Sequence, residues 1–222
     1  MTLESARGVP LELVEERVRV SERELVIVRP PDAEALLDED AFEREEFLPY
    51  WAELWPSAHA LADAVAERSL ARKRVLELGC GLALPSIVAA LGGAHVRATD
   101  WAPDAIRVAA RNAERNGVAI ETAVCSWAEP TPLVAAAPWD LVLASDVLYE
   151  ARNAELLLEL LPRLVDARGE VLLADPGRPA APTFLGHAEE RFQISSLCRG
   201  SRAATVYALR KRRSHRCRDG EE

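Results

Sequence analysis

Two closely spaced glycines and an acidic residue are the first feature of the sequence that suggests chemistry. Gly79 and Gly81 follow segment 75–78, which reads as a buried strand that must turn sharply into a helix. Glycine permits the strained dihedral angles of such a turn and lets a ligand approach the backbone closely. Asp100 lies about 20 residues further on, the spacing at which a carboxylate accepts hydrogen bonds from ribose hydroxyls. Together these residues predict a site for an adenosine-containing cofactor.

The residues around the glycines favour one such cofactor over another. A dinucleotide-binding turn needs a third glycine at position 84, which is Leu84 here and is followed by Pro85. Glu77 would repel a pyrophosphate but would attract a ligand that carries an ammonium group. S-adenosylmethionine has such a group, so the pattern favours it over a nicotinamide dinucleotide. The alternative is a tight strand-to-helix turn that binds nothing.

A second acidic residue ends another buried strand. Residues 141–145 are apolar up to a final serine, Asp146 follows them, and Tyr149 comes three residues later. Methylation of an amine requires a neutral nitrogen in line with the sulfonium carbon, and a carboxylate can orient that amine and hold its departing proton. Asp146 is therefore the candidate catalytic residue, and Tyr149 could close the pocket. The alternatives are a helix cap for Asp146 and a packing role for Tyr149.

Five tryptophans are many beside four phenylalanines and three tyrosines. Trp101 and Trp127 follow the ends of adjacent predicted strands, on the side where an open α/β sheet places its ligand. Aromatic faces suit adenine stacking and contact with a sulfonium cation, so both are candidates for cofactor binding. Trp139 enters a strand and is expected in the core, whereas Trp51 stays open between the two interpretations.

The elements that must position these residues alternate regularly from residue 75 onward. Strands are predicted at 75–78, 95–99, 120–124, 141–145, 171–174, 192–197 and 205–209, and helices at 86–91, 103–116 and 153–166. Repeated units of strand and helix imply a parallel sheet with helices on both faces. The fold class is therefore α/β, a doubly wound, Rossmann-like seven-stranded sheet whose last two strands form a C-terminal β-hairpin.

The N-terminal region lies outside this alternation. We expect residues 1–47 to be an extension that contains a β-hairpin of strands 18–20 and 25–28, followed by a short helix or flap in the acidic segment 32–47. An amphipathic helix that begins at Ser57 then precedes the sheet.

Composition limits the compartment and the partners. The net charge of −9 favours a basic partner and argues against nucleic acid. The four cysteines show no disulfide or zinc spacing, the histidines are isolated, and segment 78–96 contains too many glycines for a membrane span. The start lacks the apolar core of a signal peptide. We therefore expect a cytoplasmic protein with no metal, a main domain at 48–209 and a disordered basic tail at 210–222.

At these residues the sequence resembles the class I, seven-β-strand methyltransferases, whose glycine motif is similar to segment 77–83. It departs from that motif at Ala83, where many members have a third glycine. The resemblance implies that the two glycines of the motif embrace the methionine part of S-adenosylmethionine. It also implies that Asp100 binds the ribose and that Trp101 lies along the adenine.

Three further segments narrow the resemblance: 50–57, the D-x-x-Y element at 146–149, and D-P-G-R-P at 175–179. They resemble the D-x-x-Y protein-lysine methyltransferases, most of all the enzymes that methylate the β subunit of electron transfer flavoprotein. The resemblance implies that Trp55 and Trp127 lie against the cofactor and that the acid and tyrosine of D-x-x-Y line the methyl-transfer site. Ser145, directly before that element, joins the cofactor-binding candidates.

A protein-lysine N-methyltransferase that acts on a lysine-bearing protein is the function these features favour. A small-molecule N-methyltransferase would use the same pocket, and a non-catalytic S-adenosylmethionine-binding protein is the alternative from another class. Methyltransferases of nucleic-acid bases usually carry a proline pair beside an aromatic residue where this chain has D-V-L-Y. Two roles stay open for Asp175 and Arg178. They could form an ion pair that only holds their loop, or they could act at the methyl-transfer site.

Overall fold

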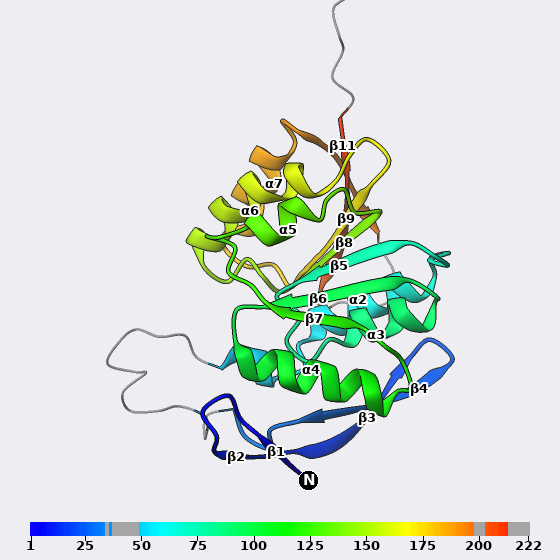
Figure 1. The fold of residues 1–222 in the computed structure, drawn as a ribbon. Coiled ribbons are helices and arrows are strands. Elements are labelled where there is room, and N and C mark those ends of the chain that lie inside the picture. Colours follow the sequence, from blue (N-terminus) through cyan, green and yellow to red (C-terminus); the bar gives the residue numbers. More distant parts are fainter. Residues whose placement is uncertain (34–35, 37–48, 198–202, 213–222) are drawn as a thin grey trace, which may run out of the picture.

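The computed structural model describes residues 1–33, 36, 49–197 and 203–212. Its centre is a seven-stranded sheet in the order β10-β11-β9-β8-β5-β6-β7 (Figure 1). The strands are β5 (Arg74–Leu78), β6 (His95–Asp100), β7 (Glu121–Val124), β8 (Leu141–Ser145), β9 (Glu170–Asp175), β10 (Phe192–Leu197) and β11 (Thr205–Lys211). The strands from β9 to β7 are parallel, and β11 is antiparallel to both β9 and β10. The predicted α/β class, doubly wound sheet and C-terminal hairpin are confirmed.

Helices cover both faces of this sheet (Figure 1). One face carries α2 (Pro56–Ala66), α3 (Leu84–Leu91) and α4 (Pro103–Arg115), and the other carries α5 (Thr131–Ala135), α6 (Ala151–Leu164) and α7 (Ala181–Ala188). In β9, Leu172 packs into the core under the first group, whereas Val171 and Leu173 pack under the second. A strand covered on both sides is apolar throughout, which is why these strands appear in the sequence as continuous apolar runs.

The order of the strands reverses between β5 and β8. From β5 the chain adds β6 and β7 on one side, and it then returns to add β8 and β9 on the other. The loops that follow β5 and β8 therefore diverge, and open α/β sheets bind ligands in the crevice this leaves at the carboxyl ends of the strands. Gly79, Asp100 and Asp146 all lie at that edge.

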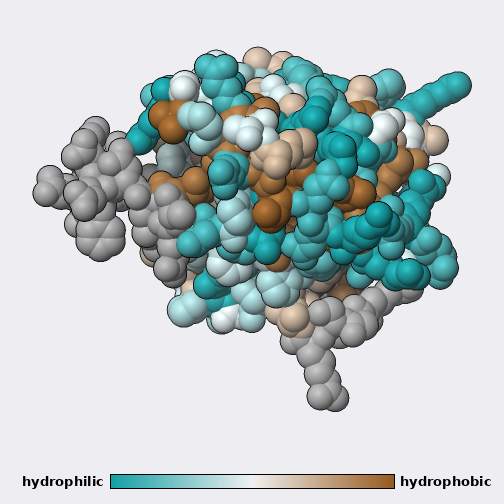
Figure 2. Space-filling model, turned by 90° about the horizontal axis from the view of Figure 1, so that it is seen from below, coloured by the Kyte–Doolittle hydropathy of each residue, from teal (hydrophilic) through white to brown (hydrophobic). Residues whose placement is uncertain are grey.

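The N-terminal region packs against the same body. It consists of two antiparallel pairs, β1 (Thr2–Glu4) with β2 (Pro10–Glu12) and β3 (Val14–Val20) with β4 (Arg23–Arg29). The β3–β4 hairpin is the one the sequence predicts, and its Val18, Val20 and Ile27 share a core with α2, α3 and α4. Helix α4 thus lies between the hairpin and the sheet (Figure 1). Seen from below, the molecule is mostly hydrophilic, with small groups of hydrophobic side chains between the polar ones (Figure 2).

Some elements differ from the sequence predictions. Helices α5 and α7 were not predicted, because each is short and has a proline in its first turn, where the missing N–H costs nothing. Arg210 and Lys211 belong to β11 rather than to the tail, because their backbones pair with Gln193 and Phe192 of β10. The rest of the tail and nearly all of the predicted helix or flap lie outside the described residues. Every helix in the described part of the chain is too short or too polar to span a membrane.

Candidate active site

A cavity of about 390 Å³ opens at the carboxyl ends of β5, β6 and β8. Its walls come from the turn after β5, the loops after β6, β7 and β8, the start of α6, and the short 3-10 helix η2 (Tyr50–Ala52) with the residues that lead into α2. All of the predicted site residues except Glu77 line it, namely Trp55, Gly79, Gly81, Asp100, Trp101, Trp127, Ser145, Asp146 and Tyr149. The fold thus gathers residues that are far apart in the sequence around one cavity.

The glycine turn needs its glycines for two reasons. Gly79 and Gly81 have φ values of 64° and 48°, in the left-handed region that side chains disfavour. A Cβ on Gly79 would lie 3.4 Å from the Trp127 ring, and one on Gly81 would lie 3.2 Å from the Trp51 carbonyl oxygen. Ala83 also has a left-handed φ, of 61°, which explains physically why the resembled family often has glycine there. The bare backbone therefore forms part of the cavity wall.

Glu77 does not line the cavity, and its buried Oε1 has no hydrogen-bond partner among the described residues, so its contact with an ammonium group stays a prediction. Its side chain is fully buried, and its Oε2 accepts hydrogen bonds from the backbone N and the Oγ of Ser86, at 3.0 and 2.5 Å. Burial raises the pKa of this carboxyl to about 8, against the lowering effect of the two bonds. Glu77 is thus mainly a neutral acid at pH 7 that fastens the first turn of α3 beneath the glycine turn.

Asp100 lines the cavity and also holds the turn. Its Oδ2 accepts a hydrogen bond from the Gly81 N–H at 2.9 Å, and its Oδ1 accepts one from the Ala102 N–H at 3.0 Å. Burial raises the pKa of this carboxyl, and the backbone donors oppose that shift. The Trp101 N–H is a third backbone donor to this carboxylate, so one of its four lone pairs is left to accept from a hydroxyl of a ligand.

Asp146 is buried at the end of β8 in a left-handed conformation, with a φ of 55°. Such strain in a non-glycine residue is concentrated at functional sites. Its Oδ1 accepts a hydrogen bond from Arg178 Nε at 2.7 Å, and the guanidinium lies 5.8 Å from the centre of the Trp55 ring. The N–H of Asp146 donates to the Ala174 carbonyl at 2.9 Å. The carboxylate is therefore fixed in place and paired with a cation.

The loop after β9 brings Arg178 to this position. Asp175 Oδ1 accepts hydrogen bonds from the N–H groups of Gly177 and Arg178, at 2.7 and 2.8 Å. The side chain of Arg178 is then directed to Asp146. This decides the question left open in the sequence: Asp175 holds the loop through backbone contacts, and Arg178 pairs with the candidate catalytic acid.

Aromatic side chains form the wall beside Asp146. The Tyr50 and Tyr149 rings lie 5.2 Å apart, the Tyr50 and Trp55 rings lie 6.2 Å apart, and Trp55 Nε1 donates to the Tyr50 carbonyl at 2.8 Å. Burial raises the pKa of the Tyr149 phenol, so it stays protonated near neutral pH. The wall is thus apolar over its rings and polar at the hydroxyl groups.

Sequence reasoning missed several residues of the site. Tyr50 belongs to segment 50–57, which carries part of the family resemblance, but the sequence predicted no role for it. Asn153 was predicted only as the first residue of a helix. Asn153 is buried and lines the cavity, and its side chain lies close enough to the Tyr149 phenol to oppose the rise in the pKa of that phenol. Its place in the first turn of α6, directly after the loop that carries Asp146 and Tyr149, is the signal that could have indicated Asn153. Within the described ranges, no three His, Cys, Asp or Glu side chains are grouped so as to hold a metal ion.

Residues 50–191 match the model of a family described as lysine methyltransferase. The chain belongs to the lysine methyltransferase family. The match begins at Tyr50, the first residue of the cavity wall, and it includes Asp146, Tyr149 and Arg178. The family that the sequence resembles is thus confirmed.

Relatives of this family member carry related names. The chain is 36% identical over 134 residues to the electron transfer flavoprotein beta subunit lysine methyltransferase of Xenopus laevis, which covers 59% of this chain and 53% of that protein. It is 33% identical over 150 residues to the protein N-lysine methyltransferase METTL21A of Danio rerio, covering 64% and 68%. It is 37% identical over 115 residues to the histone-arginine methyltransferase METTL23 of Xenopus laevis, covering 49% of each. The chain spans about half the length of the first and third of these relatives.

Solved structures show the same fold. A ribosomal protein L11 methylase from Lactobacillus delbrueckii subsp. bulgaricus is 26% identical, with a TM-score of 0.55 over 70% of this chain and 80% of that one. A 16S rRNA N2 G1207 methyltransferase from T. thermophilus is 18% identical, with a TM-score of 0.66 over 92% of this chain and 53% of that one. Because the second structure is only 18% identical in sequence, its similarity to this chain concerns the fold alone.

Membership of this methyltransferase family gives the chain S-adenosylmethionine as its cofactor, as the sequence predicts. The cavity fits that molecule in three respects. Gly79 and Gly81 line the cavity without side chains, so ligand atoms can lie against the backbone of the turn. Asp100 offers an acceptor for a hydroxyl, and the rings of Trp101 and Trp127 offer faces for an adenine and a sulfonium cation.

Proposed function

We propose that this protein transfers a methyl group from S-adenosylmethionine to a lysine side-chain amine of another protein. The observation that carries the proposal is the position of Asp146, a buried carboxylate beside an aromatic wall in the same cavity as the glycine turn. Family membership and the two lysine methyltransferase relatives support it.

Different residues along the cavity would bind the cofactor and act on the acceptor amine. Gly79, Gly81 and Asp100 would hold the cofactor, with Trp101 and Trp127 against its rings and cation. When bound, the cofactor supplies an electrophilic methyl group that passes to the amine nitrogen as its bond to sulfur breaks. The turn after β5 and the end of β8 are neighbours at the same edge of the sheet, so the methyl group and the carboxylate of Asp146 would be brought to one end of the cavity.

Asp146 and Tyr149 act on the acceptor. A lysine amine must be neutral to attack, so it loses one proton to water before transfer. After the nitrogen has gained the methyl group, the second proton passes to the Asp146 carboxylate and from there to water. The carboxylate of Asp146 accepts a hydrogen bond from the amine and directs its lone pair, and the Tyr149 hydroxyl limits the directions from which it enters. Arg178 balances the charge of Asp146, because the two are joined at 2.7 Å.

The partner and the compartment are also proposals. The β subunit of electron transfer flavoprotein is the proposed acceptor, supported by the names of two relatives that are 36% and 35% identical to the chain. The net charge of −9 suits a lysine-bearing partner. Cytoplasmic location is supported by Cys80 and Cys125, which are buried free thiols.

Labelling with tritiated S-adenosylmethionine tests the proposal. The purified protein is incubated with the electron transfer flavoprotein β subunit and, separately, with a lysate of its source cells, followed by gels with and without nuclease and by mass spectrometry. We expect a nuclease-resistant protein band whose label maps to methyl-lysine. Label on arginine would instead support the reaction named for the METTL23 relative, and label only on small molecules would support a small-molecule N-methyltransferase. Cofactor binding without any transfer would support a non-catalytic protein.

A further inference from the structure

Asn112 is an exception on the buried side of α4. The other buried residues of this helix are Ala105, Val108, Ala109 and Ala113, and Asn112 lies among them with no exposed surface. A buried amide is costly unless its donors and acceptor are all used, and Asn112 uses all three. Its partners therefore show what it does.

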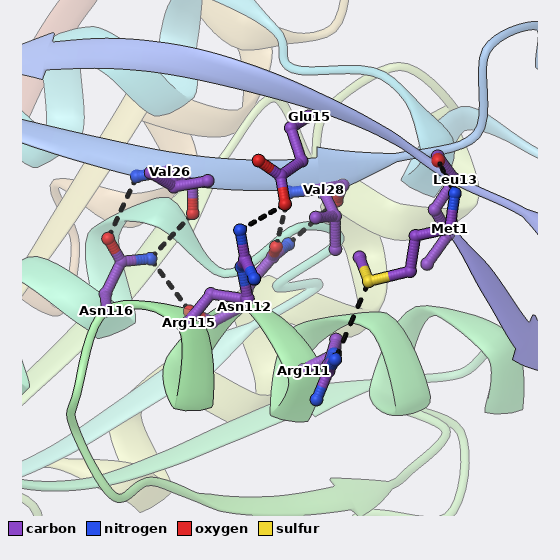
Figure 3. Close-up of polar contacts among 9 residues, drawn as sticks. All are labelled: Met1, Leu13, Glu15, Val26, Val28, Arg111, Asn112, Arg115 and Asn116. Carbon is purple, nitrogen blue, oxygen red and sulfur yellow. Dashed lines mark hydrogen bonds and ion pairs between the residues drawn. The ribbon is translucent and has the colours of Figure 1, made fainter.

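Asn112 joins the N-terminal hairpin to the glycine turn. Its Oδ1 accepts a hydrogen bond from the Val28 N–H of β4 at 2.6 Å, and its Nδ2 donates to the Val28 carbonyl at 3.1 Å (Figure 3). The second hydrogen of Nδ2 is donated to the Leu82 carbonyl, also at 3.1 Å. One side chain thus connects a strand that lies 84 residues earlier with the loop that follows β5.

Leu82 is the residue where such a contact can fix the turn. It lies between Gly81 and Ala83, whose φ values of 48° and 61° depend on how the peptide groups between them are oriented. Asp100 holds the turn at the Gly81 N–H, from the cavity side. Asn112 holds it at the Leu82 carbonyl, from the side of the hairpin, so two side chains hold the turn in addition to its own backbone hydrogen bonds.

Asn116 forms a matched contact one helical turn further along (Figure 3). Its Oδ1 accepts from the Val26 N–H at 3.0 Å, and its Nδ2 donates to the carbonyls of Val26 and Asn112, both at 2.8 Å. Both asparagines thus satisfy the free edge of β4 as a third strand would. Those contacts of Asn116 reach the hairpin and its own helix, whereas Asn112 also reaches the glycine turn.

We propose that Asn112 is a positioning residue for cofactor binding, and that docking of the β3–β4 hairpin and affinity for S-adenosylmethionine are coupled through it. The proposal rests on the cofactor and does not depend on the identity of the methyl acceptor. Because coupling between two binding equilibria is reciprocal, a docked hairpin strengthens cofactor binding and bound cofactor stabilises the docked hairpin.

Two pairs of full-length variants test this coupling. The first pair is Asn112→Ala and Asn116→Ala. The second pair is Val28→Pro and Val26→Pro. Val28→Pro removes the N–H that donates to Asn112, and Val26→Pro removes the N–H that donates to Asn116. Binding of S-adenosylmethionine is measured by calorimetry and the folded state by thermal unfolding. We expect the affinity to fall by about tenfold in the first member of each pair and to stay within about twofold in the second, and the unfolding data show how far each fall follows the loss of stability.

Equal affinities within both pairs would overturn the proposal. Any loss of affinity for S-adenosylmethionine would then come from general loosening of the hairpin and not from the contact between Asn112 and Leu82. Hydrogen exchange of the unaltered protein gives a second measurement if a variant does not fold. S-adenosylhomocysteine should slow exchange of β4 amides, with β10 as the reference strand, and unchanged β4 exchange on binding would contradict the coupling. Failure of the wild type to bind the cofactor at all would count against the proposed function instead.

Discussion

Asp146 combines burial, a strained backbone and a charged partner in one residue, and these can be separated by substitution. Asn is nearly the same size and tolerates the left-handed φ of 55°, so Asp146→Asn removes the charge with little change in the turn. We expect methyl transfer to fall by roughly 10²–10³-fold, while cofactor affinity stays within a few-fold. Single-turnover rates and calorimetry measure the two quantities. Near wild-type transfer would mean that Asp146 serves only to shape the turn.

Arg178 should set the pH range of the reaction, because a neighbouring cation lowers the pKa of an amine that binds to Asp146. The charged or titratable groups around its guanidinium are Asp146, Asp175 and Tyr50, with the ring of Trp55 nearby. In Arg178→Gln the carboxylate is no longer balanced, so the bound lysine holds its proton to higher pH. We expect the acid limb of the kcat profile to move up by about one pH unit.

Arg178→Lys is the control for that experiment, since it keeps the cation and loses the geometry of the Nε contact. Its acid limb should stay closer to that of the wild type than the limb of Arg178→Gln. Equal shifts of the acid limb in both variants would show that the shape of Arg178 rather than its charge is responsible. An unchanged acid limb in both variants would show that Arg178 does not affect the protonation of the bound lysine.

At the scale of elements, the junction between β5 and α3 depends on Glu77 being neutral. Its pKa is about 8 in the folded protein against 4.5 as its ordinary value, so between these values the folded state binds more protons than the unfolded state. Stability from this group is therefore full below pH 4.5 and declines as pH rises towards about 8. Glu77→Gln keeps an acceptor for Ser86 and removes the titration.

We expect Glu77→Gln to gain stability over the wild type progressively from about pH 5 to about pH 8, by a few kcal/mol at the upper end. Urea unfolding at a series of pH values measures the difference, in which the other titrating groups largely cancel. Cofactor affinity should change by less than about threefold, because Glu77 does not line the cavity. A large loss of affinity would support the contact with the ammonium group that the sequence suggests.

The elements and most of the cavity could be predicted because the relevant strands are apolar runs that end in polar residues. Asp100 and Asp146 follow this pattern, and the carboxyl ends of parallel strands meet at one edge of a sheet. The face of β5 that carries Glu77 could not be predicted, since a strand buried on both sides has no alternation to show which way a side chain points. Asn112 was missed for a related reason: a helical pattern counts asparagine as an exposed residue, whereas here its amide completes the edge of β4.

At the scale of the whole molecule, the hairpin, α4 and the sheet form one continuous core, so the N-terminal region supports the site from outside the segment that matches the family. Residues 50–191 carry the cavity, but Leu82 is held through a helix that also holds Val28. The family fold thus supplies the chemistry, and the extension contributes to how firmly the glycine turn is held.

The net charge of −9 should appear in the kinetics with a protein acceptor. A negative surface raises the rate of encounter with a basic, lysine-bearing partner, and salt screens this attraction over distances of about 10 Å at 0.1 M. We expect kcat/KM for a protein acceptor to fall by about tenfold between about 50 and about 300 mM salt, with kcat nearly constant. Binding of S-adenosylmethionine alone, measured over the same range, is the control, because its contacts lie inside the cavity and are screened much less. If kcat/KM did not change with salt, the acceptor would be recognised by short-range contacts around Asp146 and Tyr149 rather than by the charge of the molecule.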